Sequence, residues 1–277
     1  MGKIFSALEK INNEKLSVVQ DKKTQKEERE NKDIFLLDKI GVPNLQNQYK
    51  IDKNLVALKA PQSLEAEQFK ILRTNLLFPF SGEPPRSIMV SSFLPGEGKS
   101  FTSANLAVSI AQNIDQNVLL IDCDLRKPSI HSMFGFDDCI GLSEYLLKDV
   151  SLSSIIYKTH IERLSIIPGG HVPDNPSELL SSKDMSDLII EVKERYADRI
   201  VLIDSPPLKL TPEAIVLSRL IDGIVLVIKC GSTDRELVSG MVDSIEKNKI
   251  LGVVFNHCNK KTTPYYGYGK NKRTKKR

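Results

Sequence analysis

The sequence predicts an α/β fold: a mainly parallel, doubly wound sheet flanked by helices, with an N-terminal extension and a flexible C-terminal tail. Short, continuous apolar runs alternate with helical patterns between residues 87 and 255. Continuous apolar character is typical of strands that are covered on both faces. A glycine-rich turn ending in Lys-Ser also joins the first of these strands directly to a helix. A β-α-β succession of this kind gives right-handed crossovers and a parallel sheet.

The elements follow one another along the chain as such a sheet requires. A helix comes first, because Leu64, Phe69, Leu72 and Leu76 are spaced on one helical face and Ser63 is a suitable N-cap. The predicted strands are 87–92, 118–121, 164–167, 200–203, 224–228 and 250–255, and the predicted helices after the first strand are 100–112, 141–147, 184–197, 211–219 and 233–247. Ligands of these sheets bind at the carboxyl ends of the strands. The residues that directly follow each strand are therefore the candidates for function.

The two ends of the chain differ in composition from the middle. We divide the chain into an N-terminal helix and charged linker (1–60), the α/β domain (61–259) and a basic, tyrosine-containing tail (260–277). Apolar residues of the first 16 positions fall near helical spacing, which indicates either a short helix for a partner or membrane surface or a frayed terminal helix. Residues 21–33 are nearly all charged or polar and predict a solvated linker.

Charge and cysteine content exclude several function classes. Residues 260–277 carry eight Lys or Arg and no acid, so subtracting +8 from the net +4 of the chain leaves −4 for residues 1–259. A uniformly basic body is absent, and no nucleic acid is expected as a partner. No apolar run approaches the ~18 to 20 residues of a membrane span. The four cysteines form no CxxC pair, which argues against zinc, iron–sulfur and disulfide scaffolds and indicates a reducing, cytosolic environment.

The turn after the first strand is the strongest functional motif. Strand 87–92 runs into Phe93-Leu94-Pro95-Gly96-Glu97-Gly98-Lys99-Ser100. In a phosphate-binding loop, backbone N–H groups and the helix N-terminus surround a phosphate, the lysine reaches β- and γ-phosphate oxygens, and the hydroxyl binds Mg²⁺. We therefore expect ATP and Mg²⁺ as cofactors, with the nucleotide held by Gly96, Glu97, Gly98, Lys99, Ser100 and Phe101. The usual template has glycine where Phe93 stands, and a glycine-rich turn that merely precedes Lys-Ser is the alternative.

Two later strands end in carboxylates. Asp122 and Asp124 follow the second strand, with Arg126 after them, and Asp204 follows the fourth. Carboxylates at the ends of neighbouring parallel strands converge over the phosphate loop, where Mg²⁺ requires oxygen ligands. The predicted catalytic residues are Lys99, Asp122, Asp124, Asp204 and Arg126, and the predicted metal ligands are Ser100, Asp122 and Asp204. A single Asp at a strand end is otherwise usually a turn or cap former.

Together these residues resemble the bacterial tyrosine kinase (BY-kinase) family of capsule and exopolysaccharide machinery. This family lies within the P-loop ATPases that include the septum-site and plasmid-partition proteins, and the resemblance covers about residues 60 to 269. Partition-type relatives have a signature lysine at the position of Leu94. The kinase branch has PGEGKS and a second motif similar to the segment from Asp122 to Pro128. The resemblance therefore favours the kinase branch.

Two further matches support the same branch. Glu67, Lys70 and Arg73 look like the ExxRxxR oligomerisation helix of the family, which implies a homo-oligomer and permits a ring. Lys70 stands where the family has Arg, and lysine lacks the planar, bidentate contact of arginine; a simple amphipathic cover for the sheet is the alternative for this helix. Asn256 resembles the strand-end asparagine that faces the adenine, although by position it equally suits a turn.

The tail places Tyr265, Tyr266 and Tyr268 beside Gly and Pro, away from any apolar periodicity. The resemblance implies that they are autophosphorylation acceptors; the alternative is a disordered tail whose aromatic rings contact a partner. We interpret the protein as an ATP-dependent, non-specific protein-tyrosine autokinase that acts in trans and regulates exopolysaccharide or capsule polymerisation and export. Either Asp122 or Asp124 accepts the tyrosine proton, because a phenol with a pKa near ~10 needs a base at neutral pH.

The resemblance also implies partners. They are a membrane polysaccharide co-polymerase on a separate chain as activator, further copies of this chain, and a cognate tyrosine phosphatase. The expected location is the cytoplasm, at the inner face of the plasma membrane through a partner. The alternative function is a partition- or septum-positioning ATPase switch, which the basic tail and the amphipathic N-terminus favour. A nucleotide-binding adaptor without phosphotransfer is a third.

Overall fold

The computed structural model describes residues 51–258 except 114–115, 196–198, 210, 232, 234 and 243–244. The expected N-terminal helix, the charged linker and the tail with Tyr265, Tyr266 and Tyr268 lie outside the described residues. Within the described part, no helix has both the length and the apolar character needed to span a bilayer.

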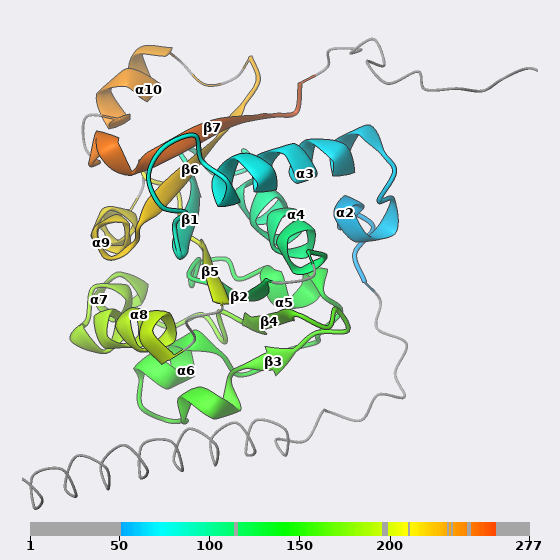
Figure 1. Cartoon of the computed structure of the whole chain (residues 1–277). Helices are drawn as coiled ribbons and strands as arrows, with labels where there is room; N and C mark the ends of the chain where they lie inside the picture. The colour runs from blue at the N-terminus through cyan, green and yellow to red at the C-terminus, as the bar shows by residue number, and fades with distance from the viewer. Residues whose placement is uncertain are drawn as a thin grey trace, which may run out of the picture.

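A seven-stranded sheet forms the centre of the molecule, in the order β3-β4-β2-β5-β1-β6-β7 (Figure 1). The strands are β1 (Ser87–Ser92), β2 (Asn117–Asp122), β3 (Tyr157–Lys158), β4 (Leu164–Ile167), β5 (Arg199–Asp204), β6 (Gly223–Lys229) and β7 (Ile250–Asn256). All neighbours are parallel except β3, which pairs antiparallel with β4. The predicted, mainly parallel sheet is confirmed, and the short edge strand β3 is an addition to it.

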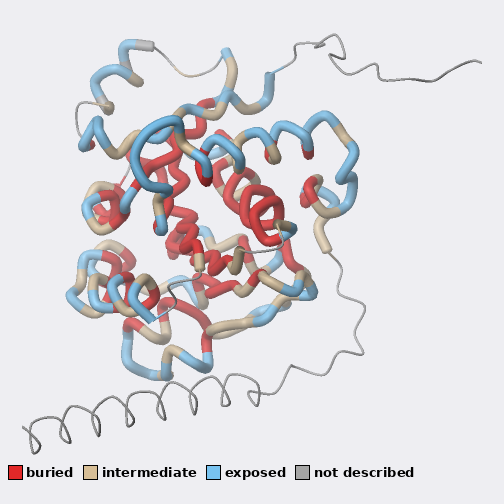
Figure 2. Tube along the Cα trace, in the orientation of Figure 1, coloured by how far each residue is buried: buried red, intermediate tan, exposed pale blue. Residues whose placement is uncertain are grey.

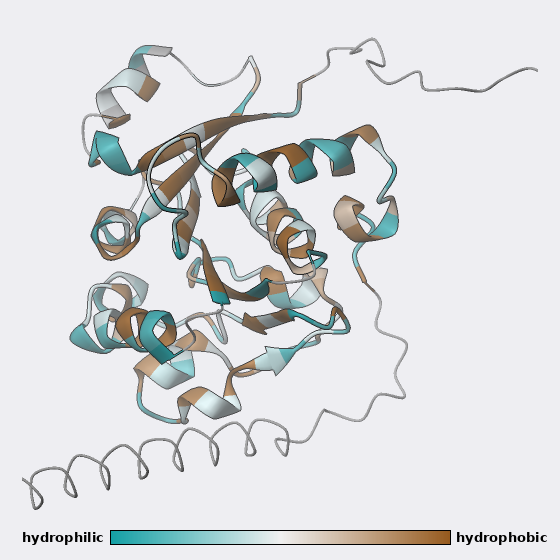
Figure 3. Cartoon of the chain, viewed as in Figure 1, coloured by the Kyte–Doolittle hydropathy of each residue, from teal (hydrophilic) through white to brown (hydrophobic). Residues whose placement is uncertain are grey.

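Helices cover both faces of the sheet (Figure 1). One layer contains α2 (Val56–Lys59), α3 (Leu64–Leu77), α4 (Lys99–Ala111) and α5 (Ile130–Met133), and the other contains α6 (Leu142–Leu146), α7 (Pro176–Leu180), α8 (Lys183–Arg195), α9 (Pro212–Leu220) and α10 (Arg235–Val242). Two 3₁₀ turns, Leu152–Ser154 and Lys247–Lys249, complete the described elements. The central strands and α4 are buried along nearly their whole length (Figure 2), and the central strands consist largely of hydrophobic residues (Figure 3).

The elements begin and end close to where the sequence places them. The Ser63 hydroxyl caps α3 by accepting a hydrogen bond from the backbone N–H of Ala66, as predicted. The last predicted helix is shorter than expected: α10 ends at Val242, and the buried Ile245 and a 3₁₀ turn lead into β7.

Residues 51–60 pack on the domain rather than belonging to a linker. Leu55 and Ala57 are buried, and the backbone N–H of Ala57 donates to the side chain of Asn105 in α4 at 2.9 Å. A boundary at residue 61 therefore leaves out ten residues that form part of the folded unit. The contact joins residues 48 positions apart, which local sequence patterns do not reveal.

One cysteine pair differs from the expectation of a reducing environment. Cys230 and Cys258 form a disulfide with their Cα atoms 5.3 Å apart. They follow the neighbouring strands β6 and β7, and the backbone N–H of Cys230 donates to the carbonyl of Asn256. The register of two parallel strands brings them together across 28 positions, a spacing that matches no cysteine motif.

Candidate functional site

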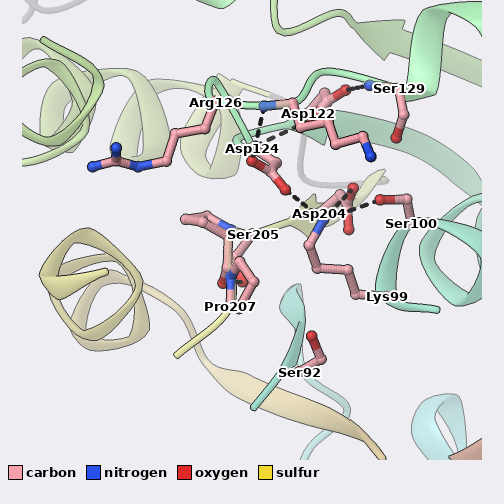
Figure 4. A network of polar contacts seen from close by, with 12 residues as sticks. Ser92, Lys99, Ser100, Asp122, Asp124, Arg126, Ser129, Asp204, Ser205 and Pro207 are labelled. Atoms are coloured by element: carbon pink, nitrogen blue, oxygen red, sulfur yellow. Dashed lines mark hydrogen bonds and ion pairs between the residues drawn. The ribbon is translucent and has the colours of Figure 1, made fainter. Parts of the chain in front are cut away.

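The strand order fixes where the site forms. β5 lies between β1 and β2, so the phosphate-type loop after β1 stands next to the carboxyl ends of both acidic strands. In this register Asp122 pairs directly with Asp204. The sheet therefore brings the loop and the predicted carboxylates to one edge, as the sequence predicts (Figure 4).

The loop itself requires its two glycines. Gly96 and Gly98 have φ angles of +78° and +97°, a region that favours glycine. A Cβ atom on Gly98 would overlap the Asn256 side-chain nitrogen, so any other residue would have to displace that side chain as well as adopt the left-handed φ. Phe93 is fully buried in the core, which accounts for its presence where the usual template has glycine.

Lys99 begins α4 and reaches into a group of acids. Its Nζ lies 2.6 Å from an oxygen of Asp124 and 3.9 Å from Asp204 Oδ2. Only 9% of Lys99 is exposed. Burial alone would lower the pKa of Lys99, but the carboxylates of Asp204 and Asp124 outweigh burial and raise it. The ammonium is therefore held charged, next to the N-terminus of a helix, where it suits a phosphate.

Asp204, at the end of β5, has one carboxylate oxygen that accepts no hydrogen bond within the described residues. Its Oδ1 accepts a hydrogen bond from the Ser103 hydroxyl at 3.0 Å, whereas Oδ2 is buried with no hydrogen-bond partner among the described residues. Burial raises the pKa of Asp204, and the positive charge of Lys99 offsets this increase only in part. Figure 4 shows that the Ser100 hydroxyl is directed toward this carboxylate.

Asp122 is held by the backbone. One oxygen accepts from the N–H of Asp124 at 3.1 Å, and the other accepts from the N–H groups of Ser129 and Ile130 at 2.8 and 3.0 Å. Burial, followed by the nearby charge of Asp204, raises the pKa of Asp122. Asp122 thus fixes the loop after β2 and the start of α5, in addition to lying beside the site.

A divalent cation fits this arrangement. Three carboxylates lie near one ammonium, and burial, followed by the charge of a neighbouring carboxylate, raises the pKa values of Asp122 and Asp204. Asp204 Oδ2, which accepts no hydrogen bond within the described residues, and the Ser100 hydroxyl are hard oxygen donors of the kind that Mg²⁺ prefers. Asp122 supplies charge, but both of its oxygens already accept hydrogen bonds from backbone N–H groups.

Arg126 points away from Lys99 (Figure 4). Its Nε lies 3.1 Å from Oε1 of Glu213, which is fully buried in α9, and its Nη2 donates to the Ser177 hydroxyl at 2.8 Å. The structure therefore does not bring Arg126 to the phosphate loop, and a catalytic role for it remains a prediction. Glu213 and Ser177 were not singled out by sequence reasoning; an acid within the apolar pattern of α9 was the available signal.

Asn256 and Phe101 are two further predicted residues, and each has a partner within the protein. The Asn256 side-chain nitrogen donates to the carbonyl of Glu97 at 2.9 Å, so the end of β7 touches the loop. The ring of Phe101 packs edge-on against Phe69 of α3, with centroids 5.8 Å apart. The ring of Phe101 thus packs against α3, and a nucleotide contact by Phe101 stays a prediction.

The predicted oligomerisation helix is α3. Glu67 and Lys70 form an exposed ion pair at 2.7 Å, and Arg73 donates to the carbonyl of Ser109 in α4 at 2.8 Å. Arg73 is thus tied within its own subunit, and ring assembly remains a prediction.

Comparisons with known proteins agree with this geometry. Residues 85–250 match the family described as AAA domain. The chain is 38% identical over 221 residues to the tyrosine-protein kinase YwqD of Bacillus subtilis (strain 168), covering 79% of this chain and 92% of that protein. It is 35% identical over 228 residues to the tyrosine-protein kinase CpsD of Streptococcus agalactiae, covering 80% and 97%. The structure of the kinase domain of the Escherichia coli tyrosine kinase ETK matches with a TM-score of 0.71 at 32% identity, covering 84% of this chain and 90% of that one.

Proposed function

This chain belongs to the bacterial tyrosine-protein kinase family, and from that premise we propose that it transfers the γ-phosphoryl group of Mg·ATP to tyrosines in the tail of another copy of itself. One observation carries the proposal: a nearly buried Lys99 at the start of α4 stands among three carboxylates, and one of their oxygens has no hydrogen-bond partner within the described residues. A phosphate-binding loop with an acidic, cation-ready side is the arrangement that phosphoryl transfer requires.

Each residue has a role in this proposal. Lys99 and the N–H groups around Gly96 and Gly98 hold the β- and γ-phosphates. The hydroxyl of Ser100 and the Oδ2 of Asp204 are the ligands for Mg²⁺, and Asp122 adds negative charge nearby. When bound, Mg²⁺ neutralises charge that develops on the phosphate oxygens.

Asp124 is the better candidate for the base. Both oxygens of Asp122 accept backbone hydrogen bonds. The Asp124 Oδ2, by contrast, is bonded to Lys99, which a phosphate would draw away. Asp124 is then left with an oxygen that is able to accept the tyrosine proton.

The acceptors in this proposal are Tyr265, Tyr266 and Tyr268, and reaction in trans follows the family resemblance. The same resemblance supports a membrane co-polymerase on a separate chain as activator and a cognate phosphatase as antagonist. It also supports a role in capsule or exopolysaccharide production at the inner face of the membrane. The partition-type switch is less well supported, because Leu94 takes the place of the signature lysine and packs against the apolar core.

A mixing experiment tests the proposal. A chain with Lys99→Met and an intact tail is the acceptor, and a chain with intact Lys99 and all three tail tyrosines changed to Phe is the donor. With Mg·ATP, phosphotyrosine should appear on the Lys99→Met tail only when the donor is present. ATP hydrolysis by the donor without any phosphotyrosine on the acceptor would instead favour a switch ATPase.

A further inference from the structure

Glu97 is an acidic residue at the centre of the phosphate-binding loop. It stands between two glycines, in a segment whose backbone N–H groups attract anions. A carboxylate there opposes phosphate binding unless its charge is directed elsewhere and offset by donors. Only 2% of Glu97 is exposed, so the side chain has a fixed place inside the protein.

The carboxylate of Glu97 accepts hydrogen bonds from three directions. Its Oε2 accepts from the backbone N–H of Leu94 at 2.8 Å, which closes the loop on itself. Its Oε1 accepts from the backbone N–H of Lys229, the last residue of β6, at 3.3 Å, and from the hydroxyl of Thr233 beyond it. The main-chain carbonyl of Glu97 accepts from the Asn256 side chain at the end of β7.

These contacts divide the site into two sides. β5 and β2 lie on one side of β1 and supply Asp204 and Asp122, whereas β6 and β7 lie on the other side. Glu97 is the loop residue that connects the phosphate loop to this second side. One buried carboxylate thus joins Leu94 of the loop to Lys229 and Thr233 on the second side.

We propose that Glu97 is a positioning residue for the nucleotide, acting through Thr233 and the end of β6 to hold the phosphate loop in the geometry that ATP requires. The inference rests on the proposed nucleotide site. It assigns no chemistry to Glu97, whose buried side chain accepts hydrogen bonds from Leu94, Lys229 and Thr233.

The hydrogen-bonding chemistry of these contacts determines which variants test the proposal. A carboxylate only accepts hydrogen bonds, whereas the amide in Glu97→Gln has one accepting oxygen and one donating NH₂ group. At least one of the three donors then faces another donor. Thr233→Val removes the hydroxyl and keeps the shape of the side chain, and Thr233→Ser keeps the hydroxyl.

The test measures the Kd of ATP by calorimetry in the full-length chain, together with the melting temperature of each variant. Glu97→Gln should raise the Kd roughly tenfold, the loss expected for about one hydrogen bond to a charged group. Thr233→Val should raise it about threefold, the effect of a weaker neutral contact. Thr233→Ser should restore wild-type affinity. With phosphotransfer as the readout, KM for ATP should rise, and kcat at saturating ATP should stay within about twofold of the wild-type value. The reason is that the variants weaken the binding of ATP equally in the ground state and in the transition state.

Asp222→Asn is the matched control. Asp222 accepts from the backbone N–H groups of Arg86 and Ser87 at the start of β1, the end of the strand away from the loop. This variant should lower the melting temperature and leave the Kd of ATP unchanged.

Two outcomes would overturn the inference. One is wild-type affinity in both Glu97→Gln and Thr233→Val. The other is a rise in Kd in Asp222→Asn that matches its loss of melting temperature, because general destabilisation would then explain the effect. A wild-type chain that binds ATP but phosphorylates no tyrosine would refute the proposed function alone, since the Kd comparison still decides the role of Glu97.

Discussion

Replacing Asp124 with Asn should strengthen ATP binding while it weakens phosphotransfer. Asp124 forms an ion pair with Lys99 at 2.6 Å, and both residues are almost fully buried. A phosphate must displace this carboxylate before it can take the ammonium. Asp124→Asn removes the competitor together with one negative charge from the site.

The structure sets the size of the effect. A hydrogen bond to a charged group contributes about 1.5 to 3 kcal/mol. In the Asp124→Asn variant, Lys99 still has Asp204 Oδ2 at 3.9 Å as a charged partner, so we expect a loss at the lower end of this range. We expect the free energy of unfolding without ligand to fall by about 1.5 kcal/mol. ATP affinity should rise by about tenfold, because the ATP complex no longer loses that contact.

The assay is calorimetric titration of ATP in EDTA, so that no change in metal binding enters the result. Asp122→Asn is the control, because it removes a buried carboxylate from the same strand end whose oxygens accept backbone N–H groups rather than pairing with Lys99. It should change ATP affinity much less. Metal-free affinity in Asp124→Asn that is unchanged or weaker than in the wild type would refute the view that Asp124 occupies the phosphate position of Lys99.

The remaining predictions concern the lysine, the tail and the opposite end of the sheet. Lys99→Met should abolish tyrosine phosphorylation with an unchanged circular dichroism spectrum, and persistent phosphorylation without another kinase present would reject the nucleotide site. Changing the three tail tyrosines to Phe should keep assemblies larger than those of the phosphorylated wild type in light scattering at low salt, because three phosphotyrosines add roughly −4.5 to −6 to a segment of +8; equal masses would show that the tail does not control assembly. Burial alone would raise the pKa of Asp222, but hydrogen bonds from Lys193 and Ser87 lower it, so its contribution is present above the ordinary pKa of 3.8 and is lost as the pH falls through the lowered value. Because Asp222 is partly exposed, Asp222→Asn should lower the free energy of unfolding at pH 7 by only about 1 kcal/mol, with the difference from wild type vanishing in acid denaturation once the pH lies below the lowered pKa of Asp222.

The parts of the fold that the sequence predicts well are those encoded locally. Continuous apolar runs define the six longer strands, and the contiguous loop from Gly96 to Ser100 defines the phosphate site before any contact is known. Asp122 and Asp204 come together because the parallel register aligns two strand ends, which the strand order of such folds makes predictable.

The parts that it does not predict depend on partners far along the chain. The position of Arg126 after Asp124 predicts a catalytic role. Its side chain instead pairs with Glu213, which lies 87 residues away in the sequence. The sequence presents Glu97 as an ordinary loop residue, although its carboxylate accepts hydrogen bonds from Lys229 at the end of β6 and from Thr233, 132 and 136 residues further along the chain. Cys230 and Cys258 likewise meet only through the pairing of β6 with β7. Tertiary contacts of this kind leave no local pattern to detect.

Intact mass spectrometry with peptide mapping tests the central claim most directly. The chain is expressed with and without Lys99→Met in a host that lacks tyrosine kinases, alone and together with a membrane co-polymerase partner. The account predicts mass increments of phosphate that map to Tyr265, Tyr266 and Tyr268 in the wild type and are absent from Lys99→Met. A wild-type chain that hydrolyses ATP yet carries no phosphotyrosine with or without the partner, or an equally phosphorylated Lys99→Met chain, would contradict it.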